Sequence, residues 1–195
     1  MLALFAVVFS GTSLGASAQD CPTEQSGRHG FVVERGDKQK SDIFHGDGGI
    51  VRTVMRYDGV PVLETTQYEG LFQLDRLDRG KKTKFEPQTN LKGLFPLGVG
   101  KIGNAKFTWE RDGQNGLSLI EIAVKSAEDL YIGPCKYSVL KIERSETRSA
   151  DPPRFVYSDY YSPMLKLSLA KQYRYPDGRS QIIKYDRIYT KLPRQ

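Results

Sequence analysis

The closest grouping of residues that could bind a metal ion is Asp42, His45 and Asp47. Two carboxylates and an imidazole are ligands that a divalent cation accepts. Successive side chains of a strand point to opposite faces, so Asp42 and His45 would face apart. The glycine-rich run 46–49 fits a hairpin turn, and the spacing lacks the D-x-D-x-D-G pattern of an EF-hand calcium loop. We therefore expect no metal site and no other cofactor.

Nucleophilic and acid–base catalysis have little more support. No serine lies in a G-x-S-x-G elbow, and the two histidines, His29 and His45, lie in a polar segment and at a turn. Glu110, Glu121 and Asp129 are conceivable partners in a hydrolase that acts on an envelope polymer. Charged residues on strands usually face solvent, however. We expect no catalytic residue and interpret the protein as non-enzymatic.

The first 18 residues predict export. Met1 to Phe9 is an unbroken apolar run, and the small residues that follow end in Ala16-Ser17-Ala18, an A-x-A cleavage signal. We expect a signal peptide over 1–18, cleavage after about Ala18, and a single β-domain over 19–195 in the periplasm. No later stretch reaches the ~18 apolar residues that a membrane span needs, so the mature chain should have no transmembrane span.

The chain has two cysteines, Cys21 and Cys135. In an oxidising compartment an isolated pair is most simply a structural disulfide. A redox-active pair would normally lie closer in sequence, as C-x-x-C. We therefore predict a Cys21–Cys135 disulfide that ties the mature N-terminus to a distant strand.

The positive charge is concentrated in the last 60 residues. The chain has 29 Lys and Arg against 23 Asp and Glu, and residues 136–195 contain 13 basic and 6 acidic side chains. Such a segment indicates an anionic partner surface, or simply a solvated basic face. The candidates to meet an anionic envelope component are Lys166, Lys171, Arg174 and Lys184. Export removes nucleic acid as the natural partner.

Alternating apolar residues between turn dipeptides predict an all-β protein. Asp58-Gly59 and Asp112-Gly113 suit tight hairpin turns, and no window has a long helical period. A short helical turn is expected only within 91–98, inside a flap over 86–100, and a slipped phase in 135–144 predicts a β-bulge. The predicted strands are 31–36, 39–45, 50–57, 60–68, 71–78, 81–86, 101–111, 117–125, 127–132, 136–147, 154–162, 165–175 and 180–189. About a dozen short strands predict a single curled antiparallel sheet, an open or half β-barrel with few or no helices.

Four apolar residues could line the concave face of such a sheet. They are Phe107, Trp109, Leu167 and Leu169. A curled sheet with aromatic residues on one face either fills its interior or holds a ligand. At this stage both interpretations stay open.

Several motifs resemble an uncharacterised family, a domain of unknown function, of exported Gram-negative all-β proteins. The resemblance is carried by GPCKYSVLKIER at 133–144, YYSPML at 160–165, KQYRYPDG at 171–178 and GLFPL at 93–97. Members look like curled antiparallel sheets, similar to the half-barrel of lipoprotein-localisation carriers. The resemblance implies a periplasmic protein with an apolar concavity and implies no catalytic residue.

Together these observations favour a non-enzymatic periplasmic cell-envelope protein. Its curled sheet would bind a lipid, another apolar ligand or an extended peptide. The alternative is a structural or protein-interaction module of the envelope that uses a sheet edge to recruit a partner strand.

Overall fold

The computed structural model describes residues 21–148, 151–175 and 177–191, and the side chains of 151–155 are not described. The predicted signal peptide at 1–18 lies outside these residues. The described chain forms one antiparallel sheet of 13 strands, one short α-helix, α1 (Ser26–His29), and two 3-10 helices, η1 (Asp47–Gly49) and η2 (Leu91–Leu94). The strands are β1 (Phe31–Arg35), β2 (Gln39–His45), β3 (Ile50–Tyr57), β4 (Val60–Tyr68), β5 (Phe72–Asp78), β6 (Lys81–Pro87), β7 (Ile102–Arg111), β8 (Gln114–Ile132), β9 (Cys135–Arg148), β10 (Asp151–Ser162), β11 (Leu167–Arg174), β12 (Ser180–Lys184) and β13 (Arg187–Thr190). The prediction of a single curled all-β sheet is confirmed.

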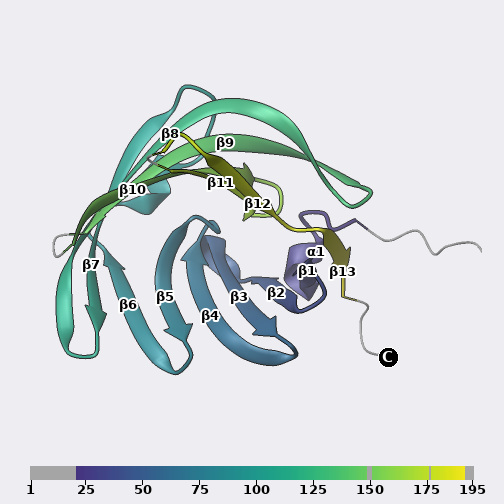
Figure 1. The fold of residues 1–195 in the computed structure, drawn as a ribbon, viewed down its shortest axis with the longest axis horizontal. Coiled ribbons are helices and arrows are strands. Elements are labelled where there is room, and N and C mark those ends of the chain that lie inside the picture. The colour runs from purple at the N-terminus through teal and green to yellow at the C-terminus, as the bar shows by residue number, and fades with distance from the viewer. Residues whose placement is uncertain (1–20, 149–150, 176, 192–195) are drawn as a thin grey trace, which may run out of the picture.

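The sheet is a meander whose two edge strands, β12 and β13, are consecutive in the chain and are connected by a short link (Figure 1). Strands β1 to β12 follow one another in order, and β13 returns to pair with β1. The link is short: Tyr185 N donates to Leu169 O on the β11 side, and Asp186 N donates to Glu34 O on the β1 side. The long strands β8 to β10 arch over β3 to β6, which gives the sheet a deep concave face.

Several strand predictions need correction, and the predicted strand 154–162 begins earlier, at Asp151. The segments 117–125 and 127–132 form one strand, β8, because the register shift between Val124 and Ser126 bends the strand without ending it. Opposite that shift the buried positions of β9 change phase between Val139 and Ile142, as the slipped pattern predicted. The segment 180–189 divides into β12 and β13, because the chain crosses there from one sheet edge to the other.

The predicted strand at 165–175 begins later, at Leu167. Residues 163–166 form the turn between β10 and β11, and Lys166 has a positive φ of 44°. The β4–β5 turn approaches this turn from across the interior. Gly70 has a φ of 68°, and a Cβ at Gly70 would overlap the backbone carbonyl of Lys166. Only glycine allows the two turns to meet so closely.

Two apolar clusters fill one half of the concave face. The first joins β1, β2, β9, β11 and β13, and includes Phe31, Ile43 and Leu169. The second joins β5, β7, β8 and β9, and includes Phe72 and Phe107, whose rings stack at 6.2 Å. We call this the closed half of the sheet.

The connection after β6, predicted as a flap, packs into the second cluster. It contains a 3-10 helix, Leu91–Leu94, which confirms the predicted short turn. Leu91 is buried, and Leu94 and Phe95 pack against the same cluster. The Phe95 ring meets the Phe72 ring edge-on at 6.2 Å. The connection therefore covers the closed half and does not stand free.

The predicted disulfide is present and seals the same half. Cys21 and Cys135 are bonded, with a Cα–Cα distance of 5.6 Å. The bond holds the N-terminal segment across the end of the sheet, where Tyr137 Oη donates to Pro22 O at 3.3 Å. Burial raises the pKa of Tyr137 to about 12. His45 lies beneath the short helix and hydrogen-bonds Leu165 O at 2.9 Å, and burial lowers its pKa.

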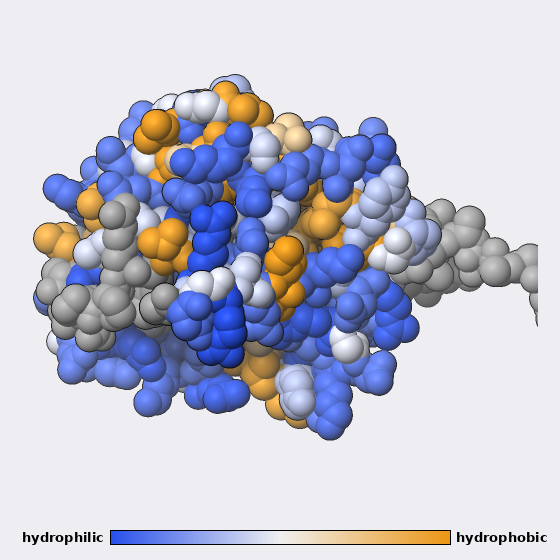
Figure 2. Space-filling view, turned by 45° about the horizontal axis from the view of Figure 1, so that its top comes forward, coloured by the Kyte–Doolittle hydropathy of each residue, from blue (hydrophilic) through white to orange (hydrophobic). Residues whose placement is uncertain are grey.

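No helix among the described residues is both long enough and apolar enough to cross a membrane. The outer face that lies over β8 to β12 is mostly hydrophilic, with apolar residues in small separate groups (Figure 2). Exposed apolar side chains such as Leu117, Val156 and Ile182 come from different strands of this region. This outer face therefore offers no continuous apolar surface for a ligand among the described residues.

Candidate functional site

A polar boundary separates the closed half from the other half of the interior. Arg144 is buried, donates from Nη1 to Leu71 O at 2.6 Å, and its guanidinium lies 5.7 Å from the centre of the Phe72 ring. Tyr161 Oη donates to Glu69 O at 2.7 Å in the same region. These bonds fix the inserted β4–β5 turn against β9 and β10.

Beyond this boundary the inward-facing side chains become polar and the interior is not filled. We call this the open half. It lies toward the hairpin turns that follow β1, β3, β5 and β7, and it contains two cavities that share Arg76. Alternation along each strand is unchanged, so the inward positions that held Phe31 and Val33 on β1 continue into Arg35.

The first cavity of the open half, which we call the β11–β12 cavity, has a volume of about 380 Å³. Its wall combines side chains from β1 to β5 with side chains from β11, β12 and the link to β13. Four cations line it, and no carboxylate lies among the described residues of its wall. The lining is Arg35, Gln39, Met55, Leu63, Arg76, Ser168, Leu169, Ala170, Lys171, Tyr173, Ile183, Lys184 and Tyr185.

Two of the four cations pair with a carboxylate that is not itself part of the cavity lining. Lys171 Nζ lies 2.8 Å from Asp159 Oδ1, and Arg76 Nη2 lies 2.6 Å from Asp78 Oδ2. Arg35 instead donates to the side-chain oxygen of Gln39, and Lys184 to a backbone carbonyl. The cavity therefore keeps a net positive charge of about two, which favours an anion.

Lys171 is held charged inside the concave face. Burial disfavours its charged form, but Asp159 and the Tyr157 ring 4.5 Å away outweigh that cost, so the pKa of Lys171 lies above its ordinary value. Asp159 has only 1% of its side chain exposed. Tyr185, on the link between β12 and β13, lies close enough to feel both Lys171 and Arg35, and burial raises its pKa.

The same cavity also offers apolar surface. Met55 and Leu63 face it from paired positions on β3 and β4, and Leu169 faces it from β11. Cations at one side and methyl groups at the other suit a molecule with an anionic group and an apolar part.

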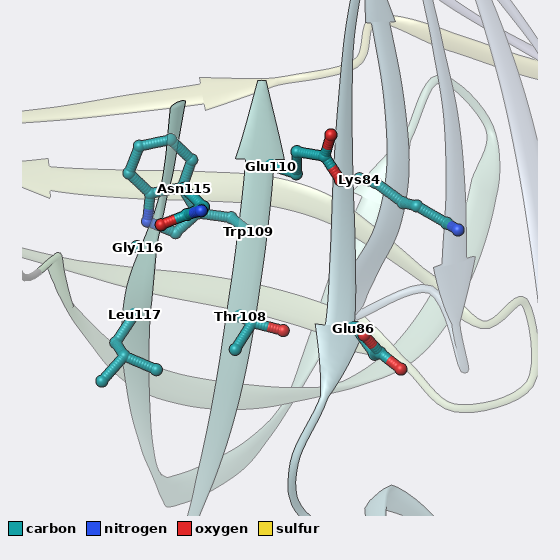
Figure 3. Close-up of a pocket in the computed structure, with 8 residues that line it drawn as sticks. All are labelled: Lys84, Glu86, Thr108, Trp109, Glu110, Asn115, Gly116 and Leu117. Carbon is teal, nitrogen blue, oxygen red and sulfur yellow. The ribbon is translucent and has the colours of Figure 1, made fainter. Parts of the chain in front are cut away.

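The second cavity of the open half, which we call the β5–β7 cavity, has a volume of about 560 Å³. Its lining is Gln73, Arg76, Asp78, Thr83, Phe85, Trp109, Arg111, Asp112, Gln114 and Arg148. On the opposite side of Trp109, a groove of about 370 Å³ crosses the outer face of β6 to β8, and we call it the outer groove (Figure 3). The Trp109 ring lies over β8 at Gly116, where a Cβ would approach it to 2.8 Å.

The four predicted ligand-wall residues divide between core and cavity. Phe107 and Leu167 belong to the apolar clusters of the closed half. Trp109 lines the β5–β7 cavity, and Leu169 is buried in the first cluster while also touching the β11–β12 cavity. The structure therefore does not bring the four together at one wall.

The four predicted anionic-surface residues also divide. Lys171 and Lys184 meet at the β11–β12 cavity, with Lys171 on the concave face and not on the outer surface. Lys166 lies in the β10–β11 turn and pairs with Glu69 at 2.9 Å. Arg174 is exposed at the end of β11. A role for these residues at an anionic envelope surface stays a prediction.

The conceivable ligands and carboxylates of the sequence lie apart. Asp42 pairs with Arg56 and Lys191, away from the buried face that holds His45. Within the described ranges, no group of three or more His, Cys, Asp or Glu could hold a metal ion. The three conceivable hydrolase carboxylates, Glu110, Glu121 and Asp129, are exposed positions, and Asp129 pairs with Lys136 at 2.8 Å.

Sequence reasoning missed Arg35, Arg76 and Tyr185. A signal for one of them was present: Arg35 follows the inward phase of Phe31 and Val33 and lies beside a turn. A cation that continues an apolar alternation toward a hairpin end points into the concave face. No such signal marks Tyr185, since its position depends on the crossing from β12 to β13.

Comparisons with known proteins supply no family. No protein-family model matches the chain, and no curated protein matches it. A solved structure that resembles it is the crystal structure of the hypothetical lipoprotein YmcC from Escherichia coli K12, with a TM-score of 0.49 and 9% identity, over 80% of this chain and 86% of that one. This weak likeness carries no argument about function, and similarity to lipoprotein-localisation carriers stays a prediction.

Proposed function

We propose that this protein is an exported, non-enzymatic binding protein of the cell envelope that holds an amphipathic anion, such as a fatty acid or an anionic lipid, in the β11–β12 cavity. The observation that carries the proposal is the lining of that cavity: four cations, no carboxylate and several apolar side chains. The Cys21–Cys135 disulfide supports export, because such bonds persist in oxidising compartments. The predicted signal peptide supports a periplasmic location.

The ligand is placed in the open half because the closed half has no room for it. Phe31, Ile43 and Leu165 are fully buried there, and interiors of this kind are close-packed. An apolar chain that ran through the whole concave face would have to displace these side chains. We therefore propose that the ligand occupies the β11–β12 cavity and not the whole concave face. Its anionic group contacts the cations, and only the adjoining carbons contact Met55 and Leu63.

A binding role requires no chemical step from the residues that line the cavity. Its ionisable groups are cations and tyrosines, and these can hold an anion by charge-assisted hydrogen bonds alone. This is why we propose a binding protein in preference to an enzyme.

Calorimetric titration with dodecanoate tests the proposal. We expect saturable binding by the wild-type protein, weakened about tenfold or more by Arg35→Gln and by Lys171→Gln, since a hydrogen bond to a charged group contributes about 1.5–3 kcal/mol. Arg174→Gln is the matched control, because Arg174 is exposed on the same strand as Lys171 but outside the cavity lining. Absence of saturable binding, or an equal loss in the control variant, would rule the proposal out.

A second candidate function rests on the β12 edge. In the described part of the chain β12 pairs with β11 alone, and Ile182 on β12 is 55% exposed. An edge of this kind can accept an extended strand from a partner protein. Crosslinking through the Ile182→Cys variant, followed by pull-down, separates the two functions: a protein adduct favours the edge module, and dodecanoate binding without an adduct favours the carrier.

A further inference from the structure

The β5–β7 cavity differs from the β11–β12 cavity in its charge. Each of its three arginines pairs with a carboxylate within two residues of it in sequence: Arg76 Nη2 lies 2.6 Å from Asp78, Arg111 Nε 3.7 Å from Asp112, and Arg148 Nε 2.8 Å from Glu146. The cavity is therefore close to neutral. Its wall presents donors from guanidinium groups next to acceptors from carboxylates, an arrangement that suits a ligand able both to donate and to accept hydrogen bonds.

Two buried donors in this wall have no partner in the described protein. They are Gln73 Nε2 and Trp109 Nε1. Buried polar groups are normally hydrogen-bonded, and an unpartnered donor at a cavity wall needs an acceptor from a ligand or from solvent. Gln73 lies on β5 and Trp109 on β7, with β6 between them, and both line the same cavity, so one ligand could reach both.

An aromatic pair forms the apolar part of the wall. Phe85 and Trp109 are direct cross-strand partners on β6 and β7, and both line the cavity. The indole lies against Gly116 on β8, where a side chain would collide with it. Because Gly116 has no side chain, the indole can lie directly against β8, and the cavity keeps an aromatic surface beside the unpartnered donors.

We propose that the β5–β7 cavity binds a neutral saccharide. Sugar hydroxyls donate and accept, which matches alternating arginine and carboxylate groups, and the C–H face of a sugar ring packs against aromatic rings. The volume of about 560 Å³ lies in the range of small-ligand pockets. The site is separate from the anion site of the proposed function, apart from the shared Arg76, and does not depend on it.

The sequence provides a direct readout, because Trp109 is the only tryptophan of the chain. Its fluorescence is followed while the full mature protein is titrated separately with maltotriose, chitotriose and lactose. At least one of them should give a saturable change, which Gln73→Ala and Gln73→Glu should weaken at least tenfold. Gln73→Glu keeps the size of the side chain and replaces the donor by an acceptor. Should either variant fail to fold by circular dichroism, Thr83→Val removes a hydroxyl from the same wall and gives the same test.

Glu110→Gln is the matched control, because Glu110 lines the outer groove on the opposite side of the same tryptophan. It should leave saccharide binding unchanged. The proposal is overturned if none of the three saccharides gives a saturable change, or if Glu110→Gln abolishes the signal while the Gln73 variants keep it. It is also overturned if trialanine, a neutral peptide, gives the stronger signal with the same Gln73 dependence.

Discussion

The closed and open halves of the concave face use the same strands and the same alternation, yet they do different things. In the closed half the inward positions carry Phe31, Ile43 and Phe107, and these side chains fill the space between the layers. In the open half the inward positions carry Arg35, Arg76 and Lys171 around unfilled volume. A curled sheet therefore does not by itself define a binding site. The residue types at inward positions decide which part becomes core and which part remains accessible.

The largest effect should come from emptying the closed half. Phe107 is fully buried and stacks on Phe72, so Phe107→Ala should lower the free energy of unfolding by about 3–5 kcal/mol. Phe85→Ala is the matched change at the boundary with the open half, where Phe85 packs against the second cluster on one side and lines the β5–β7 cavity on the other, and it should cost much less because Phe85 is only partly buried. Urea denaturation of both variants measures the difference. Equal losses would show that the two halves are packed alike.

The disulfide should give the next largest effect, since it seals the closed half. The Cys21→Ser/Cys135→Ser double variant should be less stable by about 2–4 kcal/mol, because the bond restricts the unfolded chain. Thermal unfolding followed by circular dichroism measures this loss. A double variant as stable as the wild type would mean that the N-terminal segment does not depend on the bond.

Sequence patterns predicted the fold well because β-structure leaves a local signature. The alternation and the Asp-Gly turns placed most strands within one or two residues, although β8 and β10 each begin three residues earlier than predicted. The isolated cysteine pair, in a chain with a predicted signal peptide, predicted the disulfide. The crossing from β12 to β13 was not predicted. Local sequence patterns do not determine which strands pair at the edges of a sheet.

The candidate site was predicted less well for a physical reason. Lys171 lies between Leu169 and Tyr173 in the inward phase of β11, yet a charge invites the expectation of an outward position. It can face inward because Asp159 lies beside it, and Asp159 comes from the neighbouring strand. Contacts between strands, which sequence alone does not show, decide whether a cation can be held inside.

A third effect concerns alkaline pH and again the closed half. Burial raises the pKa of Tyr137 to about 12, above its value of about 10 in an unfolded chain. The neutral form is favoured in the folded protein, so this contribution is present below pH 10 and is lost as the pH rises toward 12. Two pKa units correspond to about 2.7 kcal/mol. Urea denaturation at several pH values should show this slope, and Tyr137→Phe should flatten it; an unchanged slope would contradict the assignment.

The fourth effect is smaller and sharpens the comparison in the open half. Asp159→Asn removes the partner of Lys171, which is partly exposed, so we expect a loss of about 1–2 kcal/mol in unfolding free energy, between the values typical of exposed and of buried ion pairs. The same change frees Lys171 for a ligand and should strengthen dodecanoate binding. Denaturation and calorimetry on one variant measure both. Weaker binding together with weaker folding would mean that Asp159 serves the shape of the cavity and not its charge.

The central claim, that the β11–β12 cavity binds an amphipathic anion, is tested most directly by locating the bound anion. The chain has three methionines, and of these Met55 lines the β11–β12 cavity while Met164 lies in the β10–β11 turn with 39% of its surface exposed. Carbon-13 labelling of the methionine methyl groups, with Met55→Leu for assignment, follows both by NMR during titration with dodecanoate. We expect a saturable shift of the Met55 methyl resonance and little change at Met164. Binding that leaves Met55 unmoved would contradict the central claim.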